Sequence, residues 1–156
     1  MEPFIARTTA GKRRRAASSS VFSDSPLTFL DAADSARTIE TVRNGLPAPT
    51  VDYVASLLSI SRAALLGALH IPASTIERRI RTQAKLSAEE SDRITRVAKV
   101  LRRAVAVFGD AAQAKAWMTD KVSALGGVSP LSLLDTSEGA ELVFACLGRI
   151  EYGVYA

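Results

Sequence analysis

The chain has 156 residues, a net charge of +4 and an apolar content of 47%. This length can hold one or two small domains with buried cores. A single cysteine, Cys146, excludes an intrachain disulfide framework and fits a reducing compartment. The start of the chain does not have the pattern of a secretory signal, and no apolar run approaches the roughly 18 residues of a membrane span. We therefore expect a cytoplasmic protein without membrane spans.

Charge is distributed unevenly along the chain. Residues 61–103 contain ten Lys and Arg against four Asp and Glu, a net charge of +6. Residues 104–156 contain three Lys and Arg against six Asp and Glu, a net charge of −3, and residues 1–60 carry +1. A basic middle and an acidic end predict two surfaces with different partners.

The N-terminal part has the composition of a flexible arm. Residues 1–25 combine the basic run Lys12–Arg15 with a sequence rich in Ala, Ser and Thr. Such a run can contact DNA phosphates, but more often it is simply solvated. Residues 27–43 fit either a short strand or a helix and are a candidate dimerisation element. A glycine and two prolines at positions 45–49 then mark a boundary, so we assign residues 1–45 to the arm.

After the prolines, apolar residues recur at spacings of three and four, which predicts helices. A short apolar helix over residues 61–69 can be capped by Ser61. A tight break at residues 70–73 follows. The next helix is expected to begin at a capping box made by Ser74 and Glu77.

Two short helices joined by a tight turn, the second rich in arginine, are typical of a helix-turn-helix. The predicted recognition helix spans residues 74–82 and presents small hydroxyls at its N-terminus, with outward-facing arginines beyond them. Arginine can bind guanine or phosphate. The candidate DNA-binding residues are Ser74, Thr75, Arg78, Arg79, Arg81 and Lys85. An ordinary three-helix bundle with a solvated basic face is the alternative, and the salt dependence of DNA binding separates the two.

A long helix is predicted to follow. Ser87 and Glu90 form a second capping box, and an apolar stripe then continues as far as Phe108. The pair Gly109-Asp110 ends this helix and begins another. No strand period is visible after residue 45, so the expected fold class is all-α.

The last fifty residues predict three further helices. The first contains Trp117 as a core anchor and is expected to end at Gly126-Gly127. A short helix over residues 130–134 begins at a serine-proline pair. The last helix spans residues 137–151.

The last helix is apolar on two sides. One side carries Ala140, Val143, Leu147, Ile150 and Val154. The other carries Leu142 and Cys146, with Phe144 between the two. A helix at the edge of a small bundle needs only one apolar side. The surplus fits burial against a partner chain and burial within its own small domain against Trp117 and Leu134 equally well.

No catalytic, metal or cofactor site is predicted. His70 is the only histidine and lies in the predicted turn, while Cys146 lies among apolar residues of a helix. A zinc site would need further Cys or His residues. Gly126-Gly127 lacks the Lys-Ser/Thr that follows the glycines of a phosphate loop. We therefore do not expect an enzyme.

Three C-terminal segments carry a specific resemblance. They are Gly126-Gly127-Val128-Ser129-Pro130-Leu131-Ser132-Leu133-Leu134-Asp135-Thr136, Glu138-Gly139-Ala140-Glu141-Leu142-Val143 and Leu147-Gly148-Arg149-Ile150-Glu151-Tyr152-Gly153-Val154-Tyr155. Together they resemble the C-terminal domain of the Xre/MbcA/ParS-type bacterial antitoxins. Residues 46–108 resemble the Xre-like helix-turn-helix of the same family. The expected architecture is an Xre-like helix-turn-helix bundle over 46–108, followed by a small helical toxin-binding domain over 109–156.

The resemblance implies a concrete function. Such an antitoxin neutralises a cognate RES-domain toxin, which consumes NAD or uses it for ADP-ribosylation, by covering the active site of the toxin. It also represses its own operon by binding operator DNA, and it forms homodimers and larger complexes with the toxin in the bacterial cytoplasm. The implied toxin-binding residues are Arg149, Glu151, Tyr152, Val154, Tyr155 and Ala156. A stand-alone helix-turn-helix transcription regulator whose C-terminal domain dimerises is the alternative.

Overall fold

The computed structural model describes residues 25–30 and 34–153. The basic run Lys12–Arg15 and the implied contact residues Val154, Tyr155 and Ala156 lie outside these ranges. The described part is built of α-helices and short 3-10 helices, with two isolated β-bridges and no strands, which confirms the all-α class. In chain order the elements are η1 (Thr28–Leu30), α2 (Ser35–Asn44), α3 (Thr50–Leu57), α4 (Arg62–Ala68), α5 (Ala73–Arg81), α6 (Ala88–Phe108), α7 (Ala111–Thr119), η2 (Ser123–Leu125), η3 (Leu131–Leu133) and α8 (Ser137–Glu151).

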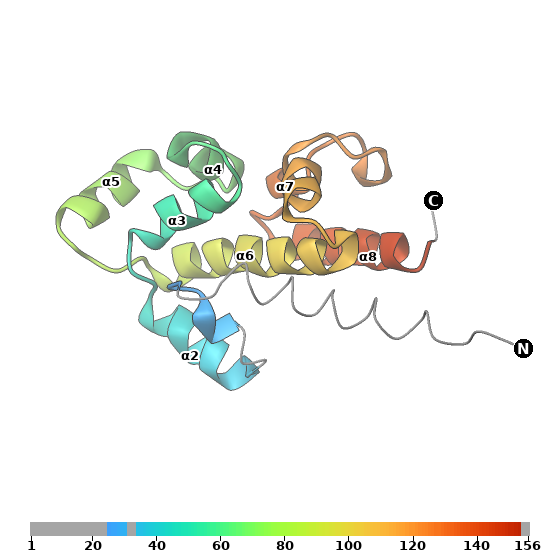
Figure 1. The fold of residues 1–156 in the computed structure, drawn as a ribbon. Coiled ribbons are helices and arrows are strands. Elements are labelled where there is room, and N and C mark those ends of the chain that lie inside the picture. The colour runs from blue at the N-terminus through green and yellow to red at the C-terminus, as the bar shows by residue number, and fades with distance from the viewer. Residues whose placement is uncertain (1–24, 31–33, 154–156) are drawn as a thin grey trace, which may run out of the picture.

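The long helix α6 is the centre of the molecule (Figure 1). Helices α3, α4 and α5 gather around its N-terminal end, α2 packs along one side, and α7 and α8 pack against its C-terminal half. The predicted capping box at its start is present, with Ser87 and Glu90 each bonding the backbone of the other. Gly109 ends the helix in the left-handed conformation. Helix α6 therefore has the bounds that its sequence signals predict.

One continuous hydrophobic core holds the two halves together. Buried side chains from η1 through α8 belong to the same cluster, including Leu27, Leu66, Leu101 and Leu147. Helix α6 contributes buried residues to both halves of the molecule. The predicted domain boundary after Phe108 therefore lies at the C-terminal end of a helix that both halves share. Among the described residues no single helix is long and apolar enough to cross a membrane, although the pair α3 and α4, bent by 94°, meets that test together.

The helix-turn-helix forms with one difference from its prediction. Ser61 caps α4 as expected, its hydroxyl accepting a hydrogen bond from the amide of Ala64 at 3.0 Å. Helix α5, however, begins at Ala73 after Pro72, without a side-chain cap. The predicted capping box at Ser74 is therefore wrong. Pro72, in an extended conformation, is the N-cap residue, so the helix begins at Ala73, two residues earlier than predicted, and Ser74 is already inside it.

Helices α3, α4 and α5 end in the same way. The residues Ser59, His70 and Gln83 have φ angles of 57°, 54° and 55°, in the left-handed region that favours glycine. After each helix the next amide returns to a carbonyl five residues back, as Ile71 does to Leu66 at 3.0 Å. This is the hydrogen-bond pattern of a Schellman motif. Each of the three turns is thus held by the backbone although none carries a glycine.

The segment after α7 differs from its prediction. Helix α7 ends at Thr119, and the backbone becomes extended at Asp120. Val122 then pairs with Val128 in an isolated bridge, its amide bonding the Val128 carbonyl at 3.0 Å. Gly126 ends the short 3-10 helix η2, and Gly126 and Gly127, both with positive φ, turn the chain between these two valines rather than ending α7. The predicted helix at 130–134 is the short 3-10 helix η3.

Helix α8 has its predicted bounds and is anchored tightly at its start. Thr136 caps it by accepting a hydrogen bond from the amide of Gly139 at 3.0 Å. A Cβ on Gly139 would lie 1.8 Å from the carbonyl oxygen of Leu133. Only glycine therefore permits this approach of α8 to η3. Trp117 of α7, predicted as a core anchor, lies against Phe108 with ring centroids 5.8 Å apart and is only partly buried, at the edge of the core.

Candidate functional site

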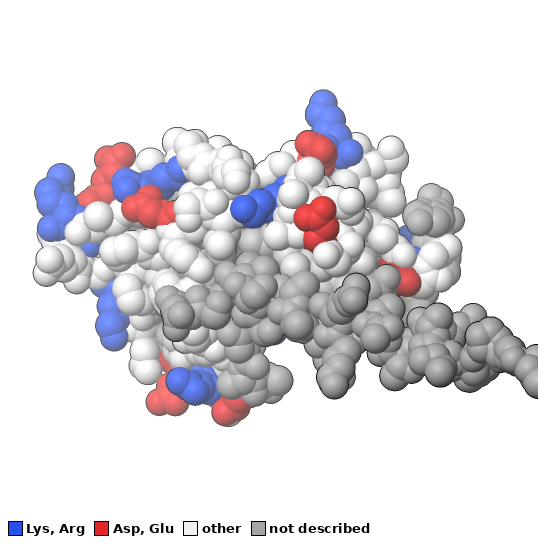
Figure 2. Space-filling model, viewed as in Figure 1, with Lys and Arg blue, Asp and Glu red and all other residues white. Residues whose placement is uncertain are grey.

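Helix α5 presents a basic outer side at one end of the molecule. Arg78, Arg81 and Lys85 are exposed, as is Ser74 in the first turn, whereas Thr75 is half-buried. Figure 2 shows Lys and Arg side chains gathered at the end of the molecule that holds α5. The two short helices and the turn between them place these cations on one protruding element. This arrangement suits contact with a phosphate backbone.

Arg79 is the exception among the predicted outward-facing arginines. Its Nε lies 3.0 Å from Oε2 of Glu90, and its Nη1 donates to the carbonyl of Lys85 at 3.3 Å. The Arg79 side chain is only 25% exposed and that of Glu90 14%. The expectation that Arg79 faces outward is therefore wrong, since the side chain ties α5 to the first turn of α6.

A further ion pair sets the start of α4. Arg62 binds Asp52 of α3 through two contacts, Nε to Oδ1 at 2.6 Å and Nη2 to Oδ2 at 2.8 Å. The hydrogen bonds that Arg62 donates to Asp52 raise the pKa of Arg62, with a smaller contribution from the charge of Glu77 on α5. Sequence reasoning missed this pair because its members lie on different helices. The pair fixes the first helix of the motif relative to α3.

The turn of the helix-turn-helix contacts the C-terminal half of the chain. Nδ1 of His70 lies 3.2 Å from Oδ2 of Asp135, the residue between η3 and the cap of α8. Arg93 of α6 donates to the carbonyls of Leu69 and His70 at 3.1 and 3.2 Å. One turn further along α6, Arg96 donates to the carbonyl of Leu134 at 2.8 Å. The two halves therefore meet at a polar junction as well as through the core.

Helix α8 buries one of its apolar sides and exposes much of the other. Ala140, Val143 and Leu147 are buried in the common core. Leu142, on the surplus apolar side predicted from the sequence, is 56% exposed. Phe144, 36% exposed, lies on a different flank of the helix, because it is two positions further along. Cys146, predicted to share the side of Leu142, is instead buried, and burial raises the pKa of its thiol while the charge of Arg149 lowers it.

The end of α8 carries three of the implied contact residues. Tyr152 is 81% exposed, and Arg149 is half-buried. Glu151 forms an ion pair with Arg103 of α6, in which Nη1 lies 3.4 Å from Oε1. The structure thus places Tyr152 on the open surface, while the Glu151 carboxylate is already engaged within the chain.

Comparison with known proteins identifies both halves. Residues 37–99 match the antitoxin Xre-like helix-turn-helix domain, and residues 103–153 match the antitoxin Xre/MbcA/ParS C-terminal toxin-binding domain. A protein named antitoxin Xre from Yersinia enterocolitica is 35% identical over 119 residues, which are 76% of this chain and 80% of that protein. The chain belongs to the Xre antitoxin family. The resemblance noted in the sequence is thereby confirmed.

Two further similar proteins extend the comparison. An antitoxin Xre from Photorhabdus laumondii is 36% identical over 114 residues, 72% of this chain and 77% of that protein. A protein of Sphingobium sp. named Prs ADP-ribosylating antitoxin is 25% identical over 127 residues, 76% of this chain and 80% of that protein. The two family models meet between residues 99 and 103, within α6. The division between the two matched domains thus lies inside the shared helix.

Proposed function

We propose that this Xre family member is an antitoxin that neutralises a RES-domain toxin encoded beside it. The toxin would be an enzyme that consumes NAD or transfers ADP-ribose, and the antitoxin would cover its active site. The observation that carries this proposal is the match of residues 103–153 to a toxin-binding domain in which α8 leaves Leu142 exposed among polar residues. An apolar centre with a polar rim is the usual anatomy of a protein interface.

The proposed toxin-binding surface runs along the exposed side of α8. Glu138, Leu142, Ala145, Arg149 and Tyr152 follow one another at spacings of three and four, and none of them is buried. Residues 104–156 carry a net charge of −3, which complements the cationic groups expected where a protein binds anionic NAD. We extend the surface to Val154, Tyr155 and Ala156, which would reach into the cleft.

Substitution at the centre of this surface tests the proposal. Leu142→Glu places a charge in the apolar centre without disturbing the core, because Leu142 is 56% exposed. We expect a loss of affinity for the neighbouring gene product of about 100-fold and a loss of rescue when the two are coexpressed. Gln113→Glu, an equally simple charge change on exposed α7, is the matched control and should leave rescue intact. Removal of residues 154–156 should weaken binding in the same assay.

A failure of this test would favour the alternative. If the wild-type chain neither bound nor neutralised the neighbouring gene product, the exposed side of α8 would be better explained as a dimer contact. The chain would then be a stand-alone transcription regulator whose C-terminal domain dimerises. Sedimentation of wild type and Leu142→Glu distinguishes this case, since only the alternative predicts that the substitution makes the protein monomeric.

The helix-turn-helix supports a second proposed activity, repression of the operon that encodes the chain. Ser74, Thr75, Arg78, Arg81 and Lys85 would contact the operator, with Ser74 and Thr75 near the base edges. Arg78→Ala and Arg81→Ala should each reduce the slope of log affinity against log salt by about one. A salt slope near zero for the wild-type chain on its promoter duplex would contradict DNA binding.

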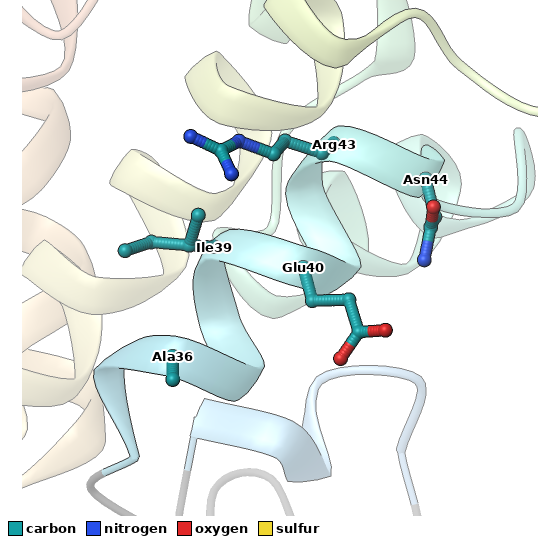
Figure 3. A pocket seen from close by; sticks show the side chains of 5 residues that line it. All are labelled: Ala36, Ile39, Glu40, Arg43 and Asn44. Atoms are coloured by element: carbon teal, nitrogen blue, oxygen red, sulfur yellow. The ribbon is translucent and has the colours of Figure 1, made fainter.

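We also propose that α2 forms the homodimer contact. Its outer side bounds an open hollow of about 400 Å³ lined by Ala36, Ile39, Glu40, Arg43 and Asn44 (Figure 3). Ile39 is 49% exposed, and Arg43 extends to the same side (Figure 3). An apolar residue beside both charge signs is self-complementary about a two-fold axis. Ile39→Asp should therefore yield a monomer in sedimentation, whereas Gln113→Asp on α7 should not.

A further inference from the structure

The exposed face of helix α5 carries one acid among its cations. Glu77, Arg78 and Arg81 follow Ser74 at spacings of three, four and seven positions, and all four residues are exposed. Residues at these spacings lie on the same face of a helix. Figure 2 shows acidic side chains beside the cations at the end of the molecule that holds α5. The surface proposed to face DNA thus includes the negative charge of Glu77.

The carboxylate of Glu77 is not needed to build α5. The helix begins at Ala73, so Glu77 lies beyond the first turn and does not form the predicted capping box with Ser74. Among residues 25–30 and 34–153, none forms a salt bridge or a side-chain hydrogen bond with Glu77. Pairing with Arg81, four positions further along, would stabilise an exposed helix only weakly. The carboxylate is therefore available to a partner outside the described part of the chain.

Arg62, at the start of α4, is the cation on which the charge of Glu77 acts. Its hydrogen bonds to Asp52 raise the pKa of Arg62 most, and the charge of Glu77 raises it by a smaller amount. Arg62 already donates to both carboxylate oxygens of Asp52, at 2.6 and 2.8 Å. Asp52 therefore holds the start of α4 in place, and Glu77 is not required for that contact.

A negative charge on this surface opposes DNA binding unless it meets a hydrogen-bond donor. The phosphate backbone is anionic, so it attracts cations and repels a carboxylate at every sequence. In the major groove, however, cytosine presents its N4 amino group as a donor, and a glutamate can accept from it. The second helix of a helix-turn-helix contacts base edges through residues near its N-terminus. Glu77 lies in the second turn of α5, on the same face as Ser74.

We propose that Glu77 selects a cytosine in the operator by accepting a hydrogen bond from its N4 amino group in the major groove. Arg78 and Arg81 would hold the helix on the DNA, and the cytosine would offset the repulsion between Glu77 and the backbone. This inference rests on the proposed operator binding. It adds a base preference and assigns it to a residue outside the predicted DNA-binding set.

The test measures base preference separately from overall affinity. The full chain is bound to a pool of duplexes of random sequence, and the bound duplexes are sequenced. Each base pair of the selected site is then changed in turn, and all affinities are measured at one salt concentration. Glu77→Gln replaces the acid by an amide of nearly the same shape, and Glu77→Ala removes it. Asp120→Ala, an exposed acid at the end of α7, is the matched control.

We expect wild type and Asp120→Ala to prefer cytosine by at least about tenfold at one base pair of the site. In Glu77→Ala this preference should fall below about twofold while the preferences at other base pairs remain. The same variant should bind random duplexes at least as tightly as wild type, because a repelling charge is gone. Glu77→Gln should move the preference at that base pair to adenine, since an amide can bond both N6 and N7 of adenine.

The exchange of cytosine for adenine is an outcome that a role in the fold alone would not produce. If wild type and both Glu77 variants had the same base preferences, Glu77 would read no base. An equal loss of affinity for all duplexes in the two variants would mean that Glu77 only supports α5. In both cases the chain still binds DNA, and the proposed repression stands. If wild type bound neither the random pool nor its own promoter duplex, the proposed DNA binding itself would fail.

Discussion

Arg103 of α6 and Glu151, the last residue of α8, form an ion pair across 48 positions of sequence. The pair ties the end of the final helix onto the long helix and gives Glu151 a structural partner. An acidic residue proposed to enter a toxin cleft is therefore already committed to a contact within its own chain. The two roles can be separated by exchanging the charges.

Glu151→Arg should weaken toxin binding, and the double variant Glu151→Arg with Arg103→Glu should not restore it. The exchange reinstates the ion pair but presents the wrong charge to the toxin. Because both side chains are partly exposed, the single changes should alter the free energy of unfolding by less than about 1 kcal/mol. Calorimetric titration and urea unfolding measure the two effects. Full recovery of affinity in the double variant would show that Glu151 acts only through Arg103.

Two glycines of α8 should respond in opposite ways to alanine. Gly139→Ala places a Cβ 1.8 Å from the carbonyl oxygen of Leu133, so η3 and α8 must separate. We expect the free energy of unfolding to fall by about 3 kcal/mol. Gly148→Ala meets nothing within 4 Å and should raise it by about 0.5–1 kcal/mol through helix propensity. Thermal unfolding of both variants checks the prediction, and a similar shift for the two would contradict the proposed close contact.

The neighbouring arginines of α5 should separate stability from DNA binding. Arg79→Ala leaves the Glu90 carboxylate without its ion-pair partner, with the Ser87 amide still donating to it, in a site where only 14% of the Glu90 side chain is exposed. The free energy of unfolding should fall by about 1–3 kcal/mol. Arg78→Ala, on the exposed side, should change it by less than about 0.5 kcal/mol. Urea unfolding gives both values, and equal losses would show that Arg79 is not the structural member of the pair.

We expect glycine substitutions at the left-handed turn residues to stabilise the protein. Gln83→Gly removes the penalty of a Cβ at a φ of 55° and should raise the free energy of unfolding by about 0.5–1 kcal/mol. Ser59→Gly should behave alike. The control Ala63→Gly, at an exposed position within α4, should lower it by about 1 kcal/mol. If Gln83→Gly were as destabilising as the control, the turn would not be strained in solution.

Because Cys146 is buried, we expect the free energy of unfolding to depend on pH. Burial raises the pKa of its thiol, so the folded chain keeps the proton that the unfolded chain loses above about pH 8.5. The associated stability is complete below that pH and declines as the pH rises further, because ionisation then favours the unfolded state. The stability advantage of wild type over Cys146→Ala should therefore shrink as the pH rises above about 8.5. A constant difference above that pH, measured by urea unfolding, would contradict the prediction.

Local signals in the sequence predicted much of the fold. Helix α8 follows from a clear apolar period, and the start of α6 follows from Ser87 and Glu90, three residues apart. The premature end of α7 was not predictable in this way. Its apolar period continues to Val122, but that valine pairs with Val128 in a bridge that only the tertiary structure creates.

The candidate site was predictable to a lesser extent. The arginines of α5 indicated its basic side, and the spacing of apolar residues in α8 indicated its surplus apolar side. Both signals lie within single helices. Which arginine turns inward depends on Glu90, eleven positions away on another helix. The contact between His70 and Asp135 likewise depends on how two segments 65 positions apart pack together. Pairings of this kind leave no period in the sequence.

Because both halves share α6, the length of this helix determines how the proposed toxin and operator are oriented relative to each other. An α-helix advances about 100° and 1.5 Å per residue. A single residue inserted between the two matched domains, near position 101, would turn the exposed side of α8 by about that angle relative to α5. Two relatives that differ by one residue in this helix would thus hold toxin on different flanks of the same operator. The length of α6 would therefore determine which larger complex of toxin, antitoxin and DNA can form.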